Sequence, residues 1–264
     1  MSHPIRPLPA EASLTELPPL TSRPMTTLVL LPGLLCDDAV WAHQRAVLPA
    51  DECIVPSFGA TDSIGAMAEH VLATVAAPRF SLVGHSMGGR VALEAARRAP
   101  QRIERLALLD SGIDPLALGA DGEREREVRM TLLATAQREG MRAMGRHWAR
   151  GMVHPSRLET PLFTQILDMI ERKAPDIFAA QISALLGRPD ARDVLRGVRC
   201  DTLLLCGRDD AWSPLARHQQ MQAMLPASHL AVIDDCGHMS TMEQPEAVSE
   251  ALAQWLRRPL AKPS

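Results

Sequence analysis

Short apolar runs and amphipathic segments alternate through the first part of the chain and again near its end. Runs of aliphatic residues without alternation predict buried strands, and they occupy residues 26–31, 53–55, 80–83, 103–109, 201–206 and 229–233. The segments between them carry apolar residues three and four positions apart, which predicts helices, the last over residues 246–257. Because strands that alternate with helices are joined by crossovers, the pattern predicts an α/β fold with a mostly parallel, doubly wound sheet.

The alternation stops at Asp114. Helical patterns without a convincing strand fill residues 115–193, and we expect them to form a helical cap over the carboxyl ends of the strands, where open α/β sheets bind ligands. Most apolar residues of this segment are expected to be core. The candidates for the roof of a pocket are Met130, Met141, Trp148, Met152, Phe163 and Met169.

The domain organisation follows from this interruption. We expect a core formed by residues 25–114 and 194–264, the cap at 115–193, and a flexible tail at 1–24. The tail lacks the continuous apolar stretch of a signal peptide, and no other segment is long enough to span a bilayer. We therefore expect a cytoplasmic protein without a membrane partner.

Composition narrows the function classes. The chain has 264 residues and a net charge of -3, without a basic patch interleaved with aromatics, so no nucleic-acid partner is expected. Five cysteines, an odd number without a C-x-x-C pair, indicate a reducing setting. Aromatic residues make up only 3% and methionines number 13, which predicts an adaptable pocket of Leu, Met and Ala. The sequence assigns no Arg or Lys to that pocket and leaves the charge of the substrate open.

A nucleophile motif lies between one predicted strand and the following helix. Residues 84–88 read Gly-His-Ser-Met-Gly, the G-x-S-x-G pattern that exposes a serine at a sharp strand-to-helix turn. A serine hydroxyl is a weak nucleophile and needs a base within reach. Ser86 is the predicted nucleophile, since the strand before it and the helix after it are the context that the motif requires.

The base and its orienting acid are expected in loops after the last two strands. His238 follows the final strand and Asp210 the strand before it, which places both at the carboxyl edge of the sheet. Asp209 is a weaker candidate for the acid. Asp110, after the strand that follows Ser86, is another weaker candidate, with the alternative that it only caps or turns the chain. We expect a mobile rather than a buried imidazole at His238.

These motifs together resemble the α/β-hydrolase superfamily over nearly all of residues 25–257. In such proteins the acid commonly lies in a G-x-x-D-x-x-x-P loop, matched here by Gly207, Asp210 and Pro214, and the histidine loop reads G-H followed by E-Q-P, as at 237–238 and 243–245. The resemblance implies the α/β-hydrolase fold with the triad Ser86, Asp210 and His238 in its usual chain order.

An oxyanion hole is also expected, because acyl transfer develops a negative oxygen. Met87 supplies one backbone N–H, as the residue after the nucleophile. The resemblance assigns the second N–H to Leu34, in the loop after the first strand, with Leu35 as the alternative. Relatives often carry His-Gly in this loop, where the present chain has Pro32-Gly33.

The predicted function is that of a serine hydrolase, which cleaves carboxylic esters of small to medium, largely apolar substrates through an acyl-enzyme on Ser86. No cofactor is expected, and no metal, since His147 and His154 lack partners at metal-ligand spacing. The same triad also serves carbon–carbon hydrolases, enol-lactonases, acyltransferases and perhydrolases. A ligand-binding protein that retains the fold is a further alternative. The expected partner is a small-molecule ester, and the protein is expected to be a monomer or a homodimer.

Overall fold

A computed structural model describes residues 26–260 of the protein. The predicted tail at 1–24 lies outside the described residues. The described residues contain a six-stranded sheet that is parallel throughout, with the strand order β2-β1-β3-β4-β5-β6. The strands are β1 (Thr27–Leu31), β2 (Glu52–Ile54), β3 (Phe80–His85), β4 (Ile103–Leu109), β5 (Asp201–Gly207) and β6 (His229–Ile233). The order reverses direction at β1 and β3, so the sheet is doubly wound, as predicted.

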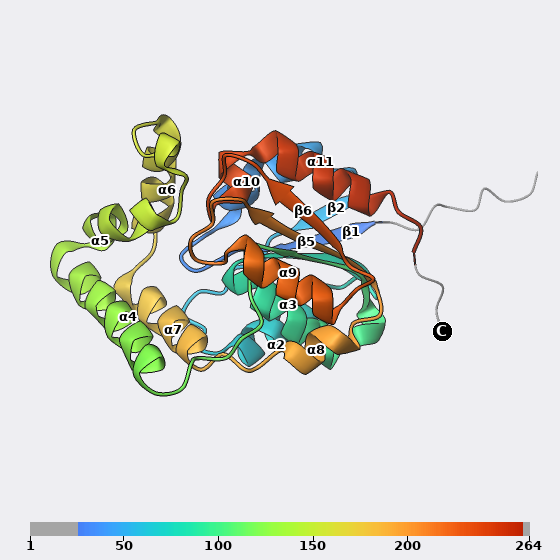
Figure 1. Cartoon of the computed structure of the whole chain (residues 1–264), viewed down its shortest axis with the longest axis horizontal. Helices are drawn as coiled ribbons and strands as arrows, with labels where there is room; N and C mark the ends of the chain where they lie inside the picture. Colours follow the sequence, from blue (N-terminus) through green and yellow to red (C-terminus); the bar gives the residue numbers. More distant parts are fainter. Residues whose placement is uncertain (1–25, 261–264) are drawn as a thin grey trace, which may run out of the picture.

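Helices cover the sheet in two groups. On one face α2, α3, α8 and α9 pack side by side, and α1, α10 and α11 form a second packed group; Figure 1 shows α10 and α11 across the sheet from α3 and α9. The bounds are α1 (Ala42–Val47), α2 (Ile64–Thr74), α3 (Met87–Arg98), α8 (Arg192–Gly197), α9 (Leu215–Met224), α10 (Ser240–Glu243) and α11 (Pro245–Leu256). The hydrophobic periodicity of the sequence did not predict the short helices α8 and α10, because their six and four residues are too few to show a helical repeat.

The inserted helices, α4–α7, connect β4 to β5. They gather beside the end of the sheet to which the arrowheads of β5 and β6 point (Figure 1). Their bounds are α4 (Ala120–Glu139), α5 (Met141–Trp148), α6 (Pro161–Glu171) and α7 (Pro175–Leu186). This is the location expected of a cap, since the carboxyl ends of the strands meet there. Among residues 26–260, no helix has both the length and the apolarity needed to cross a bilayer.

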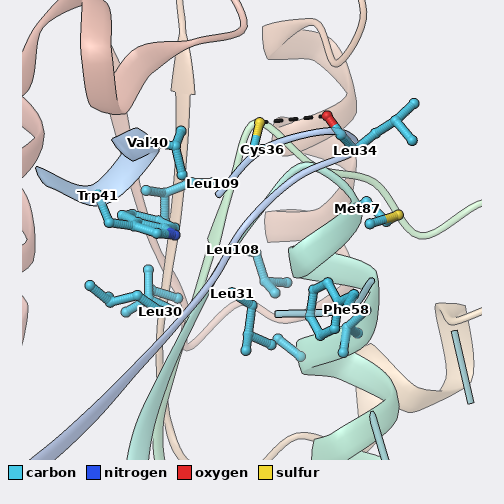
Figure 2. Close-up of a cluster of buried hydrophobic side chains, with 14 of the residues drawn as sticks. Leu30, Leu31, Leu34, Cys36, Val40, Trp41, Phe58, Met87, Leu108 and Leu109 are labelled. Atoms are coloured by element: carbon cyan, nitrogen blue, oxygen red, sulfur yellow. Dashed lines mark hydrogen bonds between the residues drawn. The ribbon is translucent and has the colours of Figure 1, made fainter. Parts of the chain in front are cut away.

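The core beneath the site is built from neighbouring strands. Leu30 of β1 and Leu109 of β4 lie on the side of the sheet that carries Trp41, whereas Leu31 and Leu108 point to the opposite side (Figure 2). All five side chains are completely buried. Consecutive strand residues thus fill both faces of the sheet, which is the reason why the strands read as unbroken apolar runs.

Candidate active site

Ser86 occupies a strained turn between β3 and α3. Its backbone has φ 53 and ψ −116, a positive-φ conformation that non-glycine residues adopt only where the surrounding structure enforces it. Glycines make the turn sterically feasible. A Cβ at Gly84 would lie 2.3 Å from the Gly88 carbonyl oxygen, and one at Gly88 would lie 2.2 Å from that of Leu31. The glycine positions of the motif are therefore dictated by backbone contact.

The three residues predicted as a triad lie in one hydrogen-bonded chain. His238 Nε2 is 2.9 Å from Ser86 Oγ, and His238 Nδ1 is 2.8 Å from Asp210 Oδ2. The second carboxylate oxygen of Asp210 accepts the backbone N–H groups of Trp212 and Ser213, each at 2.8 Å. Asp210 is thereby held with one oxygen toward the imidazole, which favours the tautomer with a proton on Nδ1 and a free lone pair on Nε2.

The local charges set the basicity of the imidazole. Burial lowers the pKa of His238, but the negative charge and hydrogen bond of Asp210 outweigh it, so the net pKa is above the ordinary imidazole value. Burial raises the pKa of Asp210, yet His238 and the two backbone N–H groups bring it below the ordinary value. The two shifts therefore favour an ionised Asp210 carboxylate beside a His238 imidazole that is more basic than usual.

The expectation that the imidazole of His238 would not be buried is wrong. The residue is only 3% exposed. Its ring lies 5.1 Å from the Trp212 ring and 5.4 Å from the His85 ring, measured between centroids. Trp212 lies two residues after Asp210 in the acid loop, and no sequence pattern indicates that its indole reaches the histidine loop.

A buried carboxylate fixes the histidine loop. Glu243 accepts the N–H groups of His154 at 2.7 Å and Met239 at 3.0 Å, and that of Gly237 at 3.1 Å from each of its oxygens. His154 belongs to the segment after α5, so one carboxylate ties the inserted helices to the loop that carries His238. In the sequence Glu243 is recognisable only as part of the E-Q-P motif, which does not reveal this role.

Replacing Glu243 by glutamine is expected to destabilise the protein by about 2–3 kcal/mol, since hydrogen bonds to a charged group are lost. Both oxygens accept N–H groups, so the amide NH2 of glutamine faces a donor in either orientation. Chemical denaturation measures the loss of unfolding free energy. Glu250→Gln on the exposed face of α11 is the matched control, and equal stability of the two variants would contradict this role.

The alternative acids occupy different environments. Asp110 is completely buried, and its carboxylate accepts the Gly207 N–H at 3.0 Å and the Ser240 hydroxyl at 2.5 Å. Burial, followed by the charge of Asp210, raises the pKa of Asp110 well above the ordinary value. Asp209 points its carboxylate toward His154, 4.0 Å away, and is 44% exposed. Neither forms a hydrogen bond with the His238 ring among the described residues.

The two predicted oxyanion donors line the same cavity as Ser86. Leu34 follows β1 and Met87 begins α3; Figure 2 shows the Leu34 loop beside the first turn of α3. Within residues 26–260, neither backbone N–H has a protein acceptor. Leu35, the alternative, donates its N–H to Gln181 Oε1 at 2.9 Å. The geometry therefore favours Leu34 over Leu35.

A cavity of about 1120 Å³ opens above Ser86 between the sheet and the inserted helices. Of the candidate roof residues only Trp148 and Met152 line it; Met130 is on the surface, and Met141, Phe163 and Met169 are buried elsewhere. The expected Leu, Met and Ala lining is only partly right, because aromatic rings contribute as well. They are those of Trp148, Phe178 and Trp212.

Arginines also line this cavity, which the sequence did not predict. They come from α3, α4, α8, α9 and the segment between α7 and α8, and are Arg90, Arg124, Arg129, Arg188, Arg192 and Arg217. No local motif marks them, since the chain brings them together only through its tertiary fold. Within residues 26–260, no group of three His, Cys, Asp or Glu side chains is arranged to hold a metal ion.

Comparison with known proteins identifies the family of the chain and several of its relatives. The model of the alpha/beta hydrolase family matches residues 28–251. The pimeloyl-[acyl-carrier protein] methyl ester esterase of Aromatoleum aromaticum is 28% identical, and the match covers 83% of this chain and 93% of that protein. A protein of Enterobacter cloacae named as a candidate carbamate hydrolase, RutD, is 24% identical, with 90% and 93% covered.

Solved structures have the same fold. A thermophilic esterase from Thermogutta terrifontis, solved with malate bound, superposes with a TM-score of 0.76 at 30% identity, covering 88% of this chain and 89% of that one. The enol-lactonase of Burkholderia xenovorans gives 0.77 at 21% identity, with 90% and 94% covered. At the latter identity the likeness extends to the fold alone.

Proposed function

Because the chain belongs to the alpha/beta hydrolase family, we propose that this hydrolase cleaves carboxylic esters through an acyl-enzyme formed on Ser86. The single observation that carries the proposal is the continuous hydrogen-bonded chain from Ser86 through His238 to Asp210, at the floor of a cavity. The esterase names among the relatives support the same class of substrate.

The reaction takes place in two halves. Ser86 Oγ attacks the ester carbonyl carbon while His238 Nε2 accepts the hydroxyl proton, and Asp210 stabilises the resulting imidazolium. The tetrahedral oxyanion accepts hydrogen bonds from the backbone N–H groups of Leu34 and Met87. On collapse the carbon–oxygen bond to the alcohol breaks, and the alcohol leaves with the proton from His238. Water then attacks the acyl-enzyme with His238 as base, which releases the acid and restores Ser86.

The substrate range is tested with p-nitrophenyl esters of increasing acyl length. Turnover of short and medium esters is expected, because the cavity has room for them beside Ser86. If the pure protein hydrolyses none of them, nor any methyl ester, the esterase proposal is wrong, and a ligand-binding role gains support.

The pH profile follows from the charge on His238. Its Nε2 must be unprotonated to accept the serine proton, so kcat/KM falls as the pH drops through the His238 pKa. That pKa is raised by Asp210 against the effect of burial. The acid limb is therefore expected above the ordinary imidazole pKa of about 6.5. Initial rates on a neutral ester measure it, and a limb below that value contradicts the assigned environment.

A further inference from the structure

Three of the six cavity arginines have no carboxylate partner among the described residues: Arg124, which is exposed, and Arg90 and Arg217, which are half-buried. Arg188 and Arg129 both pair with Glu125, at 2.7 and 2.9 Å, and Arg192 pairs with Asp114. Arg90 and Arg217 form no ion pair with any described carboxylate. Six arginines and four acids line the cavity, and one of these acids, Asp110, lies behind the triad. The remaining wall therefore has an excess of positive charge.

The guanidinium groups of Arg90 and Arg217 lie close to each other, beside a segment that contacts the backbone of Ser86. A Cβ at Gly112 would be 3.3 Å from Arg90 Nη2 and 3.5 Å from Arg217 Nε, so both groups border the backbone of this glycine. The preceding residue, Ser111, donates its hydroxyl to the Ser86 carbonyl oxygen at 2.7 Å. Arg90 lies four residues after Ser86, about one helical turn along α3.

Their hydrogen-bonding capacity is largely unused. Among the described residues, Arg90 donates only to the Asp114 carbonyl, at 2.9 Å, and Arg217 only to the Trp212 carbonyl and the Ser213 hydroxyl. A guanidinium has five N–H donors in a fork that matches a carboxylate. Burial, followed by the charges of Arg188 and Arg217, lowers the pKa of Arg90 to about 9. This cation therefore stays charged near neutral pH although its surroundings disfavour the charge, and an anionic ligand would relieve that cost.

We propose that Arg90 and Arg217 form a carboxylate-binding subsite, so that the preferred ester carries a second, anionic carboxylate a short spacer away from the scissile bond. The substrate class rests on the proposed esterase function, whereas the subsite itself can be tested by binding. This inference revises the expectation of a largely apolar substrate. Apolar and aromatic walls remain to contact the spacer, among them Leu132, Trp148 and Phe178.

Matched esters separate charge from shape. Monomethyl glutarate carries the carboxylate on the acyl side, and methyl 5-methylhexanoate is its neutral isostere; 4-acetoxybutanoate and 4-methylpentyl acetate form the same pair on the alcohol side. For one of the two pairs we expect kcat/KM to favour the anionic ester roughly ten- to a hundredfold, as charge-assisted hydrogen bonds imply. If neither pair shows such a preference, the assignment of the substrate class is wrong.

Binding to the Ser86→Ala protein tests the subsite without turnover. Isothermal titration calorimetry is expected to give at least about tenfold tighter binding for the anionic member of the preferred pair than for its isostere. Arg217→Met or Arg90→Met, added to Ser86→Ala, should remove most of this discrimination, because methionine retains an unbranched side chain without the charge. Arg196→Met, at an exposed position of α8 that does not line the cavity, should preserve it.

The outcomes are distinct. Discrimination that disappears in either arginine variant but persists in Arg196→Met supports the subsite, even if no ester is hydrolysed, in which case only the esterase function fails. Equal binding of the anionic ester and its isostere overturns the subsite, as does discrimination that survives both arginine variants. A variant that merely loosens the fold lowers binding of both members equally, and the ratio then stays constant, which also counts against the proposal.

Discussion

Ser86→Ala is expected to lower kcat for ester hydrolysis by roughly 10⁶-fold, because the nucleophile is lost and the remaining groups act only as a unit. The residual rate would come from the cavity and the oxyanion donors. The change removes one hydroxyl whose hydrogen-bond partner is His238, so the fold should be retained. Single-turnover and steady-state rates on a p-nitrophenyl ester measure the loss.

Ser57→Ala is the matched control for this variant, since Ser57 is exposed and does not line the main cavity. It should hydrolyse the ester at the wild-type rate. A Ser86→Ala protein that retains more than about one per cent of the wild-type kcat would mean that another group carries the reaction.

Asp210→Asn is expected to reduce kcat by about 10⁴-fold, since the amide would favour the wrong imidazole tautomer. The asparagine NH2 would donate to His238 Nδ1 and leave the proton on Nε2, which then cannot accept the proton of Ser86. The Asp210 oxygen that accepts the Trp212 and Ser213 N–H groups is preserved in asparagine. The loss should therefore appear in kcat without a comparable loss of stability.

Asp110→Asn provides the contrast. Burial raises the pKa of Asp110 well above its ordinary value, so a neutral amide is a fair substitute. An asparagine can still accept the Gly207 N–H and donate to Ser240 Oγ. We expect less than about a tenfold fall in kcat, since no charge that orients the imidazole is removed. A larger fall than that of Asp210→Asn would reverse the assignment of the acid.

The sequence was most informative where chemistry depends on local backbone. Gly84 is required by a contact within the turn and Gly88 by the close approach of the backbone after β1, and both requirements appear in a motif of only five residues. The central strands β1, β3, β4 and β5 could also be predicted well, because both of their faces are buried and their apolar runs are continuous. The α/β-hydrolase fold that these features predicted is confirmed by the family match. The domain boundaries remain predictions.

Features formed by distant segments could not be predicted in this way. Arg90 and Arg217 lie more than a hundred residues apart and converge only across Gly112. Trp212 covers His238 from a neighbouring loop, which makes the imidazole buried although its loop reads as exposed. Such contacts depend on the tertiary packing of α3 and α9 against the loops after β4, β5 and β6. The hydrophobic periodicity of the sequence does not predict that packing.

The nucleophilic role of Ser86 is tested most directly by covalent labelling. A fluorophosphonate probe is incubated with the wild-type protein, and the modified residue is identified by peptide mass spectrometry. We predict one adduct, on the peptide that contains Ser86, and none in Ser86→Ala. An adduct on a different serine, or labelling that persists in Ser86→Ala, would contradict the proposed mechanism.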